Sequence, residues 1–221
     1  FINQKMKNYE VVVVNVTGDA EVTDQLSIMR IQHGDRLTTT RLAADPLFPI
    51  STKMALNVGI KAARYDNLLF TLPDCTPRSD RWAEVMARGF AEHEVVLGYS
   101  ALMPRKGVWN RLIRCSNMLL ATRWIAAAAG SHPYRGMLAN IGFTKKIYFG
   151  ARGFNHLNLN MGEDDLFINE HVPSHRINAD ISPYSVVRCT ATNSRAWQND
   201  KLSRLFIRKK MHGIIPYLLS G

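Results

Sequence analysis

YEVVVVNV, at residues 9–16, decides the fold class of this chain. Four consecutive valines are typical of a strand that is buried on both faces of a parallel sheet. A turn follows, and a short amphipathic helix is expected at residues 21–31. After a polar stretch, a helix at residues 52–65 leads to a second buried strand at residues 67–71. This order predicts an α/β protein with a central, mostly parallel sheet flanked by helices.

The rest of the chain continues this alternation. Helices are predicted at residues 79–92, 108–129 and 162–171, strands at 94–99, 176–181 and 185–190, a short strand or turn at 145–149, and a basic amphipathic helix at 195–212. The helix at 108–129 carries three arginines and is too charged to span a bilayer. A length of 221 residues fits one domain, residues 1–221.

The net charge is strongly positive, with 28 Lys and Arg against 18 Asp and Glu. A charge of +10 favours an anionic partner, which is a nucleic acid, a phosphorylated small molecule or a membrane surface. The basic residues are spread along the chain, apart from a cluster at 204–210. Nucleic-acid binding is therefore disfavoured, because it normally requires a compact basic face.

The three cysteines, Cys75, Cys115 and Cys189, are odd in number and lack CxxC spacing. This predicts neither a disulfide framework nor a zinc site, and it favours a reducing compartment. The chain opens without Met and reaches a strong strand within a dozen residues, so upstream sequence is expected to be missing.

Two acidic segments carry the candidate chemistry. Asp74 comes directly after the strand at 67–71, where ligands of parallel sheets bind, and there it either caps or turns the chain or holds Mg²⁺ or Mn²⁺. Glu163, Asp164 and Asp165 lie in the first turn of a helix. Capping accounts for one or two of them, but three crowded acids also raise the pKa of at least one, as a general base requires.

An aromatic residue near the end of the chain is a further candidate. Trp197 lies between Arg195 and Arg204, and it would either stack on a sugar or lipid headgroup beside phosphate-binding cations or pack on the body of the protein.

The order of these blocks resembles family-2 glycosyltransferases of the GT-A fold, particularly membrane-associated bacterial enzymes. The matching blocks are YEVVVVN, KMALNVGIKAARYDNLLFTLPDC, PYRGMLANIGFTKKIYF and GEDDLFI, followed by a helix with a tryptophan, and they cover roughly residues 8–205. The resemblance implies an inverting transferase that moves a sugar from a nucleotide-diphosphate sugar to a carbohydrate or lipid-linked acceptor. It also implies a location at the cytoplasmic face of the bacterial inner membrane.

The resemblance assigns roles to individual residues. By position, Asn15 matches the residue that reads the nucleotide base, and Lys53 lies in the helix beside the nucleotide pocket. Asp74 matches the metal-binding last acid of the DxD motif, and Asp164 matches the general base. Glu163 and Asp165 would be orienting or capping charges.

The chain departs from the family pattern in three places. Leu72 replaces the first acid of the DxD motif, Asp200-Lys201-Leu202-Ser203 replaces a Gln-Lys-Arg-Arg segment, and the first family strand is absent. These departures keep open an alternative function, a degenerate module that binds nucleotide sugars without turnover.

Overall fold

The valine run forms strand β1, Val11–Asn15, which pairs in parallel with β2, Leu37–Arg41. The computed structural model describes residues 1–42, 51–153, 163–193, 195–199, 201–202 and 211, apart from the side chains of Glu163, Asp164, Leu166 and Ser174. Val11 to Val14 are half-buried, so the predicted burial on both faces is wrong. β2 lies in the stretch predicted as polar loop.

The central sheet has the strand order β3-β7-β5-β8. Its strands are β3, Asn67–Phe70, β5, Val95–Gly98, β7, Ile141–Thr144, and β8, Ile177–Asp180. β7 runs antiparallel to β3 and β5, whereas β5 and β8 are parallel. The carboxyl ends of β3, β5 and β8 therefore meet at one edge of the sheet.

A smaller sheet has the order β4-β9-β6. Its strands are β4, Cys75–Pro77, β6, Ser100–Leu102, and β9, Val187–Cys189. β9 is antiparallel to β4 and parallel to β6. Among the described residues, three of the six strand pairings are parallel, so the α/β prediction is confirmed and the sheets are only partly parallel.

The cysteine prediction is wrong, because Cys75 and Cys189 form a disulfide. The two residues lie opposite each other in the register of β4 and β9, although 114 positions separate them in sequence. Spacing along the chain gives no sign of this pairing, since it follows from the strand register. Cys115 is free and exposed.

The helices mostly follow the predicted boundaries. They are α1, Ala20–His33, α2, Thr52–Ala62, α3, Trp82–Arg88, α4, Val108–Ala129, α5, Lys145–Gly150, and α6, Glu163–His171, with short 3-10 turns at Gly34–Arg36, Gly89–Ala91, Leu138–Asn140 and Ser174–Arg176. α5 corrects the strand or turn expected at 145–149. The Thr144 hydroxyl accepts the backbone N–H of Ile147 and so caps this helix.

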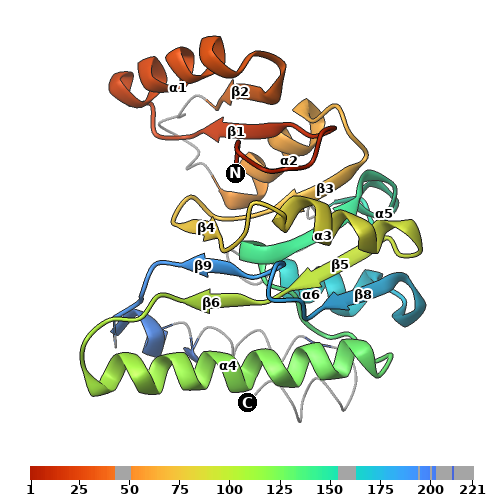
Figure 1. Ribbon diagram of the computed structural model, residues 1–221. Coiled ribbons are helices and arrows are strands. Elements are labelled where there is room, and N and C mark those ends of the chain that lie inside the picture. Colours follow the sequence, from red (N-terminus) through yellow and green to blue (C-terminus); the bar gives the residue numbers. More distant parts are fainter. Residues whose placement is uncertain (43–50, 154–162, 194, 200, 203–210, 212–221) are drawn as a thin grey trace.

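The helices cover both faces of the central sheet. Along β5, Val96 packs with Trp82 and Met86 of α3, while Val95 and Leu97 point to the opposite face. That face is filled by large buried residues of the other helices and of the segment before β7: Ile60, Trp124, Tyr134, Tyr148, Phe167 and Ile168. In Figure 1 the β1–β2 sheet lies at one end of the molecule and α4 lies at the other.

Asn140 is fully buried and joins three segments. Its Oδ1 accepts the Trp82 indole N–H at 3.0 Å, and its Nδ2 donates to the carbonyl oxygens of Tyr99 and Ser185 at 2.9 and 2.8 Å. Gly98 leaves room for this side chain, since a Cβ there would lie 2.5 Å from Nδ2. Asn140 thus fixes α3 and the end of β5 to the loop before β9.

An Asn140→Ala variant is expected to lower the free energy of unfolding by about 2–4 kcal/mol, because the buried Trp82 indole N–H and the Ser185 carbonyl lose their hydrogen bonds and the Tyr99 carbonyl keeps only that from the Val187 N–H. Chemical denaturation measures the change. The matched control is Asn117→Ala, which removes a half-buried amide that donates to the Ser100 carbonyl at 2.9 Å. Equal losses in both variants would contradict the role of Asn140 as a buried junction.

Candidate functional site

Asn15 ends β1 and shapes the loop that follows. Its side chain is buried, and its Oδ1 accepts both the backbone N–H and the hydroxyl of Thr17 at 3.0 and 2.8 Å. Its Nδ2 donates to the Thr23 hydroxyl at 3.1 Å. The side-chain oxygen of Asn15 is thus used within the turn into α1, while its Nδ2 has a second N–H for a further hydrogen bond. Lys53, the other predicted nucleotide contact, is half-buried in the first turn of α2.

Asp74 lies in a tight turn between β3 and β4, closed by a hydrogen bond from the Cys75 N–H to the Leu72 carbonyl at 3.0 Å. Its own carbonyl accepts the backbone N–H and the hydroxyl of Thr190 at 3.1 and 3.0 Å. Asp74 caps no helix, since α3 begins only at Trp82. The backbone is held by the segment after β9, and the residue is exposed at the carboxyl end of β3.

The donor set around Asp74 is sparse. Within the described residues, no group of three or more His, Cys, Asp or Glu side chains is placed to hold a metal ion. Leu72, at the position of the other expected acid, is partly exposed beside Asp74. Mg²⁺ and similar ions are commonly held by one or two carboxylates together with substrate phosphates. A single strand-end carboxylate therefore fits a cation that arrives with a diphosphate, and it does not fit a cage made by the protein alone.

The acidic segment begins α6 as predicted. The side chains of Glu163 and Asp164 lie outside the described residues. The Asp165 Oδ1 lies 3.2 Å from the Arg135 Nε. Both side chains are buried, with 6 % of Arg135 and 5 % of Asp165 exposed. Asp165 thus anchors the first turn of α6 to the segment before β7.

Arg135 was not predicted as a functional residue. It lies in the PYRG segment, and the only sequence signal is an arginine in an otherwise apolar stretch. Its neighbour Tyr134 is also buried, and this burial raises the pKa of the phenol to about 12. Tyr134 therefore stays neutral beside the ion pair.

Solved structures of low sequence identity share this architecture. TarS from S. aureus, residues 1–349 in complex with UDP, is 18 % identical with a TM-score of 0.57, over 92 % of this chain and 58 % of that chain. The mannosyltransferase PcManGT from Pyrobaculum calidifontis, in complex with GDP-Man and Mn²⁺, is 16 % identical with a TM-score of 0.63, over 91 % and 54 %. The chain has the GT-A fold.

The sequence comparisons add no further relative, since no family model matches the chain and no curated protein matches it. The chain spans little more than half the length of the solved structures it resembles. At this identity the likeness concerns the fold, and the activity has to be argued from the residues of this chain.

The tryptophan helix lies only partly within the described residues of this GT-A fold. Residues 195–199, 201 and 202 are helical, Arg195 is exposed, and Arg204 lies outside the described residues. The Lys201 ammonium lies 4.3 Å from the centroid of the half-buried Trp197 ring. One face of this ring is thus covered by a cation of its own helix, one turn further along.

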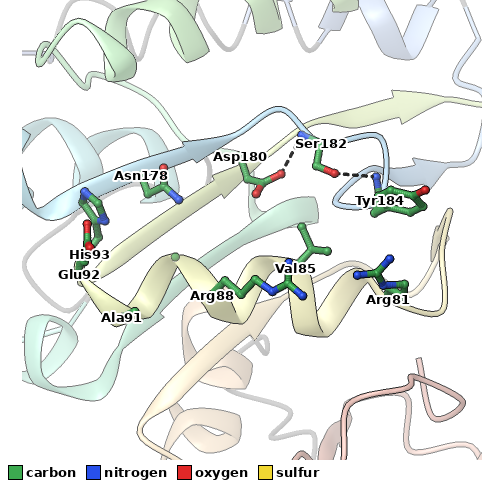
Figure 2. A pocket seen from close by; sticks show the side chains of 11 residues that line it. Arg81, Val85, Arg88, Ala91, Glu92, His93, Asn178, Asp180, Ser182 and Tyr184 are labelled. Carbon is green, nitrogen blue, oxygen red and sulfur yellow. Dashed lines mark hydrogen bonds between the residues drawn. The ribbon is translucent and has the colours of Figure 1, made fainter.

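A groove of about 560 Å³, which was not predicted, lies between α3 and β8. In Figure 2 the side chains of Arg81 and Arg88 extend from α3, with Asn178 and Asp180 of β8 and Tyr184 across from them. The Arg81 guanidinium lies 5.2 Å from the Tyr184 ring centroid. Arg81 and Arg88 both pair with Glu84, and the Asp180 carboxylate accepts the Ser182 N–H at 2.8 Å. These local contacts account for Arg81, Arg88 and Asp180 of the groove.

Proposed function

We propose that the protein is an inverting, cation-dependent glycosyltransferase that moves a sugar from a nucleotide-diphosphate sugar to an acceptor hydroxyl, with residues 1–221 as one catalytic domain. The observation that carries the proposal is Asp74, an exposed carboxylate on a fixed backbone at the carboxyl end of β3. The fold supports the proposal, because TarS, in complex with UDP, and PcManGT, in complex with GDP-Man and Mn²⁺, have the same fold.

The donor would lie along the strand ends that bear Asn15, Lys53 and Asp74. Asn15 would use its remaining N–H for the base, and Lys53 would place a cation beside the phosphates. Asp74 would hold Mg²⁺ or Mn²⁺, which neutralises charge on the departing diphosphate when it is bound.

The acceptor chemistry would fall to α6. The Asp164 carboxylate would take the proton of the acceptor hydroxyl as its oxygen attacks the anomeric carbon, while the bond from that carbon to the diphosphate oxygen breaks on the opposite side. Attack in line with the leaving group inverts the configuration. Glu163 and Asp165 would orient the base, and the contact of Asp165 with Arg135 supports this role because it fixes the first turn of α6.

The acceptor would be a carbohydrate or a lipid-linked saccharide at the cytoplasmic face of a bacterial inner membrane. Trp197, Arg195 and Arg204 would help to bind it. Nucleic acid would not be a partner. In the described part of the chain, none of the helices combines the length and apolarity needed to cross a bilayer. The Cys75–Cys189 disulfide weighs against a strongly reducing compartment, since such bonds are rare in the cytosol. The strand register holds the two residues together even when their thiols are reduced.

A degenerate binding module remains the alternative, and Leu72 favours it, because the position beside Asp74 offers no second carboxylate. Both functions require nucleotide binding, but only the first requires turnover. Sugar transfer by the unmodified chain would therefore decide between them.

Binding of UDP or GDP is expected to require Mn²⁺ or Mg²⁺. Asp74→Asn should weaken nucleotide binding in the presence of the cation at least tenfold, since a charge-assisted contact of about 1.5–3 kcal/mol is lost. Titration calorimetry with and without cation measures this. Asp80→Asn is the matched control, because this exposed carboxylate follows β4 instead of β3 and pairs with Lys5. Binding that is identical with and without cation would contradict the proposed site.

A further inference from the structure

The outer face of α4 is a hydrophobic stripe. Val108, Leu112, Cys115 and Leu119 follow one another at spacings of four, three and four residues, which places them on one side of a helix. All four are exposed, Val108 to 70 % and Leu112 and Leu119 each to 53 %. Trp109 beside the stripe is 64 % exposed. A monomeric protein in water rarely leaves such a contiguous apolar surface open.

The opposite face of α4 is the one that packs on the protein. Its buried residues are Asn110, Ile113, Ala121, Trp124 and Ala128, again at helical spacing. The helix therefore has two apolar stripes on opposite sides, of which only one contacts the core. Among the described residues nothing covers the outer stripe, which leaves it available to a partner.

The surroundings of the stripe are positively charged. Arg111 and Arg114 are exposed on α4, and Arg105 and Lys106 are exposed just before it. The sequence contains no Asp or Glu between Glu94 and Glu163. An apolar stripe with an aromatic residue and cations beside it is typical of a helix that lies in the headgroup layer of an anionic membrane.

We propose that α4 is a membrane-docking helix, which lies flat on an anionic lipid surface with Val108, Leu112, Cys115 and Leu119 inserted below the headgroups. Arg105, Lys106, Arg111 and Arg114 contact lipid phosphates. A second copy of the chain fits this surface less well, because two such faces bring together cations without a matching acid.

The position of α4 gives this surface a consequence for the reaction. The Met103 N–H bonds the Cys189 carbonyl at 2.9 Å just before α4, and Thr190, the next residue, bonds the Asp74 carbonyl. Because β4, β9 and β6 are neighbouring strands, Asp74 lies on the order of 10 Å from the segment that leads into α4. Docking by α4 would bring the Asp74 end of the molecule to the lipid surface, where a lipid-linked acceptor is presented. This last step rests on the proposed function, but the lipid contact itself does not.

Flotation of the full chain with vesicles tests the proposal. The chain is expected to bind vesicles that are one-third phosphatidylglycerol far more tightly than pure phosphatidylcholine vesicles. Arg111→Gln with Arg114→Gln should weaken this binding roughly 25-fold, at about fivefold for each cation. Leu112→Gln with Leu119→Gln should weaken it at least tenfold, because apolar area no longer enters the lipid. The control is Ile28→Gln with Ile31→Gln on α1, which removes two exposed isoleucines elsewhere and should change nothing.

A fluorescent label on Cys115 reports insertion directly, because Cys75 and Cys189 are joined to each other and leave a single free thiol. An environment-sensitive dye there should brighten on anionic vesicles, whereas the same dye at Ile31→Cys in a Cys115→Ser background should not. Absence of vesicle binding, or equal binding by the α4 and α1 variants, overturns the proposal. So does a lipid-free dimer that Leu112→Gln with Leu119→Gln dissociates. Cation-dependent nucleotide binding, measured on the same samples, separates failure of this surface from failure of the proposed transferase.

Discussion

An Asp164→Asn variant is expected to lose sugar transfer by about 10²–10⁴-fold in kcat while its nucleotide binding stays unchanged. The amide has nearly the same shape as the carboxylate, but it cannot take the proton of an acceptor hydroxyl near neutral pH. The loss should therefore appear in kcat rather than in the dissociation constant of the nucleotide. Product formation from a labelled nucleotide sugar measures the first quantity, and calorimetry with Mn²⁺ measures the second.

The matched control for this variant is Glu170→Gln. It makes the same change from acid to amide on α6, two turns further along, beside His171. Transfer by this control should be close to that of the unmodified chain. If Asp164→Asn keeps full transfer, Asp164 is not the base. If the unmodified chain binds nucleotide but transfers no sugar to any acceptor, the degenerate module with Leu72 is favoured instead.

Elements with a strong periodic signal were predicted well. α4 spans Val108–Ala129, as expected from a long stretch without Gly or Pro, and β3 follows from a short apolar run. β2 was missed because Leu37–Arg41 is rich in threonine, so that a strand resembles a polar loop. The short β4 and β6 carry too few residues for a period of two to be visible.

From the sequence, residues could be proposed for the site only where a local feature of the chain pointed to them. Asp74 was predicted as a site residue because it follows a strand, which is a local feature, and its role stays a prediction. The disulfide of Cys75 and the ion pair of Arg135 with Asp165 were not found, because each depends on residues that are brought together by strand register or helix packing. The apolar stretch around Arg135 is a weak local sign of burial, but it does not identify a partner that is about 30 positions away.

The Arg135–Asp165 pair is expected to dominate the stability of the acidic segment. Replacing Arg135 with Met removes a buried cation 3.2 Å from the Asp165 carboxylate, and this should lower the free energy of unfolding by about 3–5 kcal/mol. The exposed pair of Lys5 and Asp80, with 2.9 Å between Nζ and Oδ2, is the matched control. Lys5→Met should change the free energy of unfolding far less than Arg135→Met, because water solvates the remaining carboxylate.

A double-mutant cycle shows whether charge or packing is responsible. When Asp165→Leu is added to Arg135→Met, the buried charge is removed together with its partner, so much of the lost stability should return. If the proposed function is correct, sugar transfer should not return with it, because the double variant lacks the cation that holds the first turn of α6. Denaturation and transfer assays on the same four proteins separate the two effects. A double variant that regains both stability and transfer would show that the ion pair contributes only to folding, and that Asp164 is placed by the apolar contacts of Phe167 and Ile168.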